Sequence, residues 1–257
     1  MILRTGLIPI MTALLLLFQT QAQSTTPTEP ANPEAIAKSI LEKADEIRFP
    51  RESFQVEVAI RTTSPGQIDE LRQYRVLSKG NENSIVLTTE PASERGQAIL
   101  MKGRDLWVFM PSVSQPIRLS LSQRLTGQVA NGDIARANFT GDYHPKLLHN
   151  DTLDGENYHV LELTGVDRSV TYQRVLLWVN QENGQPFKAE FYSLSGRLLK
   201  TSRYENFEMI LGKLRPTQMI MEDALKQGEI SILNYSGMQL RDLPDKLFTK
   251  NYLKRLE

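Results

Sequence analysis

The sequence predicts a mainly β (α+β) protein, built on one antiparallel sheet of about eleven strands that two helices cover. Eleven segments alternate apolar and polar residues, or are apolar throughout, at lengths typical of strands. Their connectors carry Gly, Pro and Asn, as at residues 64–66 and 79–81, which favours hairpins. Two other segments, one near each end of the chain, have apolar residues at helical spacing. A sheet of this many strands does not stay flat, so we expect it to present a concave face.

The first 31 residues differ in composition from the remainder. Arg4, an apolar run over residues 7–18 and the small residues around Ala22 predict a signal peptide over residues 1–22, cleaved near Ala22; the alternative is an uncleaved membrane anchor. Residues 23–31 are polar and contain proline, which is typical of a flexible tether. Residues 32–257 show no internal repeat and predict a single domain.

A helix is predicted to open this domain, over residues 32–48. Asn32 is a favourable N-cap, Pro33 suits the first helical position, and Phe49 and Pro50 end the pattern. The apolar stripe expected to face the sheet consists of Ile36, Ile40, Leu41, Ala44 and Ile47.

The strands follow at short intervals. They are predicted at residues 54–61, 70–79, 84–89, 97–102, 105–110, 158–163, 174–179, 187–192, 197–207, 217–221 and 229–235. The segment 105–110 is apolar on both faces and is stopped by Pro111, and a short return strand starts at Pro116. Such a strand needs two covers, of which one is a core and the other a filled or lipid-binding interior.

Two segments do not fit the strand pattern. Residues 122–154 alternate poorly and include Gly127, Gly132 and Gly141, so we expect short helices and loops packed over the opening of the sheet. A second helical stripe is expected at the C-terminus, entered through residues 243–245. It consists of Leu247, Phe248, Tyr252 and Leu256.

Composition excludes several classes of function. The chain of 257 residues has no cysteine, which excludes disulfides, thiol catalysis and lipid attachment through cysteine. Its 30 basic and 30 acidic residues balance, so nothing favours a nucleic-acid partner.

Candidate catalytic and metal-binding residues are weak. His144 and His149 lie near Asp142 and Asp151, but the spacing of five matches no established ligand pattern, and surface histidines are the simpler interpretation. No serine nucleophile motif is found. We therefore expect no enzyme activity, no metal and no cofactor.

Three segments resemble those of a known family. The run 105–111, followed by Ile117 and Arg118, resembles the D-x-W-x-(Y/F)-x-P segment and the basic return strand of the LolA-like outer-membrane lipoprotein-sorting proteins. Residues 131–139 lie where that family has a G-S-D-F-S-Y turn. Residues 186–192 and 196–200 resemble its P-x-(K/R)-x-E-F-Y strand and the G-x-L-x-K that follows. The resemblance extends from about Glu34 to the C-terminus and rests on the order and spacing of these segments.

This resemblance implies an unclosed antiparallel β-barrel whose concave apolar face is covered by helices and binds the acyl chains of a lipoprotein or lipid in the periplasm. The expected partners are this cargo, an inner-membrane transporter and an outer-membrane acceptor, and the protein is expected to be a monomer.

The residues predicted to line the hydrophobic cavity are Val56, Val58, Ile60, Met101, Trp107, Val108, Phe109, Met110, Phe191 and Met219. At any one of these positions an ordinary core is the simpler interpretation. Within residues 105–110, either Trp107 and Phe109 or Val108 between them would face the cavity. Arg118 is predicted to contact a headgroup or partner, ahead of Arg124 and Arg136, although ion pairing or solvation is the simpler interpretation for each of the three.

Two other functions remain open: an accessory protein that docks on an inner-membrane lipid transporter without its own ligand, and a periplasmic hydrolase. For the carrier, we expect residues 122–154 and the helix over residues 32–48 to form a movable lid, because an apolar face must be hidden in water and exposed for loading.

Overall fold

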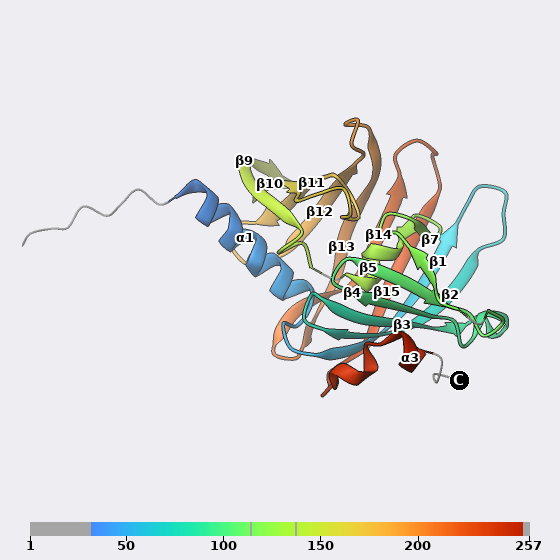
Figure 1. Ribbon diagram of the computed structural model, residues 1–257. Helices are drawn as coiled ribbons and strands as arrows, with labels where there is room; N and C mark the ends of the chain where they lie inside the picture. Colours follow the sequence, from blue (N-terminus) through green and yellow to red (C-terminus); the bar gives the residue numbers. More distant parts are fainter. Residues whose placement is uncertain (1–31, 114, 137, 254–257) are drawn as a thin grey trace, which may run out of the picture. The chain divides into compact units, whose positions relative to one another are not determined.

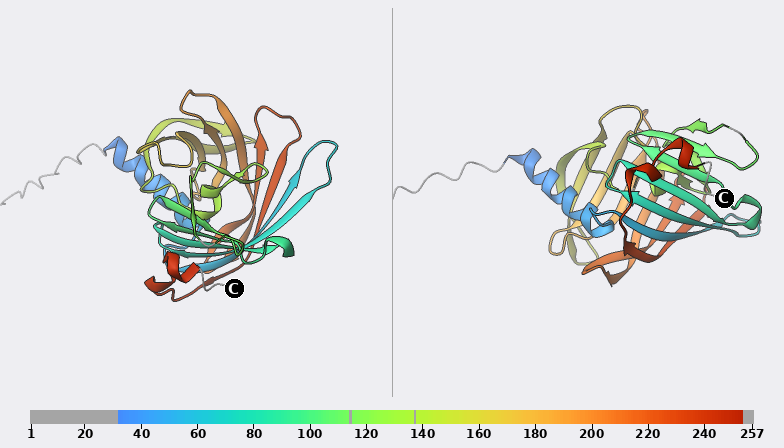
Figure 2. Two further views of the ribbon diagram at one scale, coloured as in Figure 1. Left: turned by 45° about the vertical axis from the view of Figure 1, so that its right-hand side comes forward. Right: turned by 60° about the horizontal axis from the view of Figure 1, so that its bottom comes forward.

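The computed structural model describes residues 32–113, 115–136 and 138–253 (Figure 1). One antiparallel sheet of thirteen strands dominates this part of the chain, in the order β6-β5-β4-β3-β2-β1-β15-β14-β13-β12-β11-β10-β9. Strand β1 pairs with both β2 and β15, and this pairing joins an early and a late meander. The edge strands β6 and β9 do not pair with each other within the described ranges, and the sheet curves into an unclosed half-barrel (Figure 2).

The elements have the following bounds. The early meander consists of β1 (Phe54–Thr63), β2 (Glu70–Lys79), β3 (Asn83–Glu90), β4 (Ala98–Lys102), β5 (Asp105–Phe109) and β6 (Ile117–Leu119). The late meander consists of β9 (Tyr143–Leu153), β10 (Glu156–Gly165), β11 (Arg174–Asn180), β12 (Pro186–Tyr192), β13 (Leu198–Ile210), β14 (Lys213–Asp223) and β15 (Ile230–Leu240). Between them lie the small hairpin β7 (Arg124–Thr126) and β8 (Val129–Ala130) and the helix α2 (Asn131–Ala135). The remaining helical elements are α1 (Pro33–Arg48), η1 (Ala92–Glu94), η2 (Asp245–Leu247) and α3 (Lys250–Leu253).

All eleven predicted strand segments are strands, and so is the return strand near residue 116. The expectation of helices and loops throughout residues 122–154 is wrong for its second half, which is the eleven-residue strand β9. Among the described strands, β9 pairs with β10 alone, and most of its residues are exposed or half-buried. An edge strand of this kind buries no complete face, so its sequence lacks the alternation that marks the other strands.

Helix α1 begins as predicted. The Glu34 amide donates to the Asn32 side chain at 3.1 Å, and Pro33 occupies the first turn. The buried stripe is rotated from the predicted one, because Ile36 is 41% exposed while Asp45 and Arg48 are buried. The helix packs against β9, β12 and β14.

The C-terminal segment is less helical than predicted and lies on the opposite face of the sheet. It consists of η2 and the single turn α3, and Leu256 lies outside the described residues. Figure 2 shows α3 on the outer, convex side. There Leu243, Phe248 and Leu253 form a cluster with residues of β3, β4 and β5, so only α1 of the two predicted helices covers the concave side. We call residues 243–253 the outer cover.

In the described part of the chain, no helix is both long and apolar enough to cross a membrane. The predicted signal peptide and tether, residues 1–31, lie outside the described residues.

Candidate functional site

The concave side of the sheet carries one large apolar cluster. Six predicted lining residues belong to it and are all buried: Val56, Val58, Ile60, Met101, Phe191 and Met219. Val108 packs against the same cluster and remains partly exposed. We call this cluster the inner surface; it draws on strands of both meanders.

Strand β5 divides the remaining predicted residues between the two faces, since successive side chains of a strand point to opposite sides. Trp107 and Phe109 belong to the cluster under the outer cover, not to the inner surface. Met110 lies one residue beyond β5 and is half-buried. Arg118 pairs in register with Trp107 and is therefore also on the outer face, where it contacts Asp105. Of the two alternatives for this strand, the structure thus places Val108 on the inner surface, and Trp107 and Phe109 on the other face.

Residues 120–142, of which residue 137 is not described, fill the concavity of the sheet, and we call them the plug. Figure 2 shows the sheet curving around the hairpin β7–β8 and α2. Apolar plug residues enter the inner cluster, namely Leu121, Val129, Ala130, Ile134, Ala135 and Phe139. Two glycines allow close approach: a Cβ at Gly127 would lie 2.3 Å from hydroxyls of Thr62 and Ser231, and one at Gly132 would lie 2.0 Å from that of Thr171. Two of the three glycines noted in this segment thus mark places where the plug touches the sheet or its loops, whereas Gly141 has open space around it.

A buried cluster around Asp133 forms the first polar anchor of the plug. Lys200 of β13 donates to Asp133 Oδ2 at 3.0 Å and to the carbonyl of Gln128. The hydroxyl of Tyr172 donates to the same carboxylate at 2.7 Å. Burial, together with the Asp133 carboxylate, raises the pKa of Tyr172 well above its usual value, so this tyrosine is a donor at neutral pH.

The second anchor is centred on Asp142 at the end of the plug. Its carboxylate pairs with the buried guanidinium of Arg136 and accepts from Arg104 Nε at 2.9 Å. Arg136 also donates to the carbonyls of Asn81 at 2.6 Å and Gly103 at 2.9 Å, in the turns after β2 and β4. This anchor therefore ties the plug to the early meander.

The third anchor ties the plug to α1. Asp45 accepts from the amides of Phe139 at 3.0 Å and Thr140 at 2.7 Å and from the Thr140 hydroxyl at 2.7 Å. Arg48 pairs with Asp45 at 3.2 Å and lies over the Phe139 ring. Burial raises the pKa of Asp45, although Arg48 and the hydrogen bonds oppose this.

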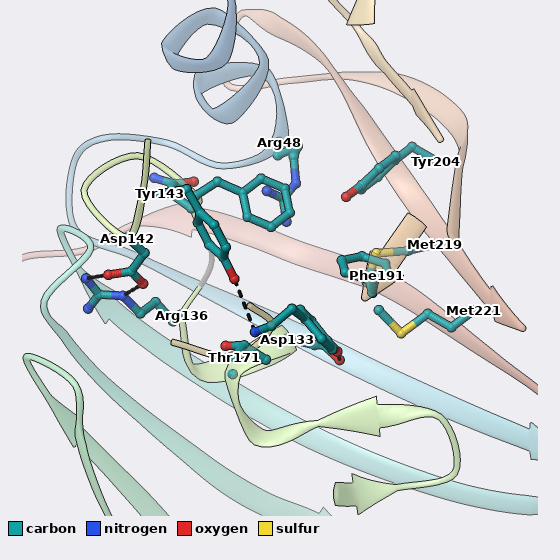
Figure 3. A pocket seen from close by; sticks show the side chains of 14 residues that line it. Arg48, Asp133, Arg136, Asp142, Tyr143, Thr171, Phe191, Tyr204, Met219 and Met221 are labelled. Carbon is teal, nitrogen blue, oxygen red and sulfur yellow. Dashed lines mark hydrogen bonds and ion pairs between the residues drawn. The ribbon is translucent and has the colours of Figure 1, made fainter. Parts of the chain in front are cut away.

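Little open space remains inside. Figure 3 shows the pocket between the plug and strands β12 to β14, where Arg48 and Tyr204 approach Phe191 and Met219. Its volume is about 20 Å³, and a second, mainly apolar cavity beside Phe54 and Ile134 has about 10 Å³. Pockets that bind drug-sized ligands have volumes of roughly 300–1,000 Å³. A long ligand on the inner surface would have to displace the plug.

The histidine pair does not form a metal site. His144 and His149 are exposed on β9, while Asp142 is bound by arginines and Asp151 accepts from Trp178 Nε1 at 3.0 Å. Within the described ranges, no group of three or more His, Cys, Asp or Glu residues is arranged to hold a metal ion.

Sequence reasoning missed the polar anchors. For Arg136, the sequence favours ion pairing or solvation over a headgroup contact. The pair with Asp142 agrees with ion pairing. Asp133 and Lys200 lie in segments that resemble the family, but their pairing could not be read from the sequence because they are 67 residues apart. Asp45 has a local partner in Arg48, whereas its bonds to Phe139 and Thr140 join residues distant in sequence.

The comparisons with known proteins agree with this fold. A family model described as an uncharacterized protein matches residues 80–255. The crystal structure of a LolA superfamily protein from Nitrosomonas europaea is 79% identical, with a TM-score of 0.82, over 84% of this chain and 98% of that one.

More distant structures share the fold alone. A domain described as an outer membrane lipoprotein-sorting protein, from Vibrio parahaemolyticus, is 22% identical with a TM-score of 0.74, over 86% of this chain and 100% of that one. A DUF1329 family protein from Desulfovibrio piger is also 22% identical, with a TM-score of 0.75, over 86% and 99% of the two chains. No curated protein sequence matches. On the 79% identity to the Nitrosomonas protein and the shared half-barrel, the chain belongs to the LolA superfamily.

Proposed function

We propose that this protein is a periplasmic carrier that binds the acyl chains of a lipoprotein or lipid against its inner surface. One observation carries the proposal: an apolar surface built from both meanders is covered by a plug whose anchors are polar. A carrier must hide such a surface in water and expose it to cargo. The lipoprotein-sorting domain from Vibrio, which shares the fold, supports the same assignment.

The energies are compatible with displacement of the plug by a long acyl chain. Burial of one methylene contributes about 0.8 kcal/mol, so a chain of about sixteen carbons contributes on the order of 10 kcal/mol. Removing one partner of a buried ion pair costs about 3–5 kcal/mol because the other charge stays buried. A plug that swings out exposes both partners to water, so opening each anchor costs less than that. A long chain can therefore offset more of the cost of opening the anchors than a short one can, while the buried apolar residues of the plug add to that cost.

The segment that we propose to move is shorter than the segment 122–154 expected from the sequence. Residues 143–153 belong to the sheet, so the lid we propose is the plug, with α1 attached to it through Asp45. Loading at an inner-membrane transporter and release to an outer-membrane acceptor would each act on this cover. We propose that the carrier works as a monomer.

A cysteine lock tests the proposal. A Cβ built at Gly132 of the plug lies 2.9 Å from the Cβ of Thr171, in the loop between β10 and β11, and a shift of roughly 1 Å brings the pair into disulfide range. The G132C/T171C double variant should bind a fluorescent fatty acid when reduced and lose that binding when oxidised. The single variants G132C and T171C, treated with the same oxidant, are the controls, since the native chain has no cysteine. Binding that is equal in the oxidised and reduced double variant would contradict a moving plug.

A second function, the accessory interaction protein, is favoured by the small volume of the two interior cavities. Native mass spectrometry of protein purified from a membrane-containing host separates the two. A retained lipid supports the carrier. Protein without lipid that also fails to bind the fluorescent fatty acid supports the accessory function.

A further inference from the structure

Three neighbouring hairpins end in exposed apolar residues at one end of the half-barrel. Figure 1 and Figure 2 show the β1–β2, β14–β15 and β12–β13 hairpins projecting side by side beyond the rest of the sheet. Their turns carry Ile68, Leu225 and Leu194, which are 94%, 62% and 67% exposed. The first two turns meet, because a Cβ at Gly228 would lie 2.9 Å from Pro65. We call these three turns, residues 64–69, 193–197 and 224–229, the hairpin tips.

A cleft opens between the hairpin tips and the plug. Its volume is about 330 Å³, and its basic lining residues are Arg124, Arg197, Lys200 and Lys226. Two of these charges are already compensated, since Lys200 binds Asp133 and Lys226 binds Glu229 at 3.0 Å. Arg124 and Arg197 are exposed and form no ion pair with any described residue.

One carboxylate, that of Asp223, also lines the cleft, and its negative charge reduces the positive charge of the cleft without cancelling it. Asp223 accepts from the amides of Leu225 at 2.7 Å and Lys226 at 2.9 Å, and Asp69 lies 3.8 Å from Arg61. On the neighbouring loop between β10 and β11, Arg168 is exposed and has no ion pair among the residues that the structure describes. This end of the molecule thus combines protruding apolar side chains with three arginines that form no ion pair among the described residues.

The β13–β14 hairpin, at the opposite end of the sheet, lacks this combination. It also exposes apolar residues, with Met209 at 68% and Leu214 at 44%. Its nearest basic residue, Lys213, is neutralised by Glu46 at 2.6 Å. Exposed apolar residues alone do not identify a partner, but apolar residues among free arginines match the interface of an anionic bilayer.

We propose that the hairpin tips dock on an anionic phospholipid surface, with Ile68, Leu194 and Leu225 entering the interface and Arg124 and Arg197 binding headgroup phosphates in the cleft. The docked cleft borders Gln128 and Lys200, which belong to the first anchor of the plug. Docking therefore brings lipid to the edge of the plug, where cargo would enter or leave the inner surface. The docking itself does not depend on the carrier function, because vesicle binding is measured without cargo.

Cosedimentation with phosphatidylcholine vesicles, with and without phosphatidylglycerol, tests the proposal. We expect binding only when phosphatidylglycerol is present, and weaker binding as salt is added. The R197E variant should lower the partition coefficient by about fivefold or more, since one basic residue near an anionic surface contributes about 1 kcal/mol. The matched control is K102E, at the opposite end of the sheet, where Lys102 is exposed.

A second pair of variants tests the apolar part. The I68S/L194S/L225S variant should lose most of its vesicle binding while keeping the circular dichroism spectrum of the wild type. The M209S/L214S variant, which changes exposed residues at the other end, should bind as the wild type does. Equal binding to vesicles with and without phosphatidylglycerol, or equal losses in the test and control variants, would overturn the proposal. Lipid retention by native mass spectrometry is a separate measurement, so failure of docking is distinguishable from failure of the carrier function.

Discussion

The two covers of the sheet are held in different ways. The outer cover lies on β3 to β5 through Leu243, Phe248 and Leu253, which are at most 3% exposed. Its polar contacts are peripheral, such as the Lys79–Asp245 pair at 2.6 Å, in which Asp245 is 88% exposed. The plug also packs apolar residues on the sheet, but it adds three anchors of buried charged groups.

The difference indicates which cover can open. An apolar cover that detaches exposes apolar area on both surfaces, and contact with water does not stabilise the exposed groups. A charged anchor that opens exposes groups that water solvates well, so part of its cost is recovered. The outer cover is thus suited to stay on the sheet, whereas the plug is suited to open, and the two lie on opposite faces of the same strands.

The largest effect expected from this comparison is at β5, where neighbouring residues lie under different covers. Phe109 is 8% exposed under the outer cover, whereas Val108 faces the inner surface and borders an open cleft beside Leu119. Phe109→Asp should destabilise the fold by more than about 4 kcal/mol, because it removes a buried ring and buries an unpaired charge. Val108→Asp should cost clearly less and should reduce lipid retention. Urea unfolding and native mass spectrometry check both, and similar unfolding of the two variants would show that β5 is core on both faces.

An anchor of the plug gives the next effect. Asp142→Asn leaves the buried Arg136 guanidinium without its carboxylate, which should cost about 3–5 kcal/mol. The control is Asp167→Asn, which removes the 52% exposed partner of Arg104 and should cost less than about 1 kcal/mol. Hydrogen exchange should show faster exchange in the plug than in the outer cover of D142N. Uniform acceleration over both covers would mean that the plug does not open separately.

The sequence predicted those features that depend on neighbouring residues. The cap of α1 at Asn32 and the alternation of β1 are local patterns, and both are confirmed. Strand β5 was predicted to need two covers, and the structure supplies both. The alternation could not tell which face was which, because both faces of β5 are apolar.

The remaining features depend on distant pairing. Lys200 and Asp133 are 67 residues apart. Both lie in segments that resemble the family, but nothing in the sequence shows that the two side chains pair. The pairing of β9 with β10 supplies the backbone partners of a strand whose side chains are mostly exposed, so composition alone could not identify it. The polar anchors and the plug therefore became visible only in the folded chain.

The smallest effect expected concerns the end of α1, where an exposed contact supplements the buried third anchor. Lys213 donates to Glu46 at 2.6 Å, and this hydrogen bond lowers the pKa of Glu46 below its usual 4.5. Since the pKa is lower in the folded protein, the contribution is complete above about pH 4.5 and is lost as pH falls through the folded pKa. Both side chains are more than a third exposed, so we expect less than about 1 kcal/mol. Urea midpoints measured between neutral and acidic pH should fall slightly more steeply in the wild type than in Glu46→Gln, which lacks the titrating group. Parallel curves would show that this contact adds nothing to the buried anchor at Asp45, and that α1 is held to the plug and the sheet by its buried groups.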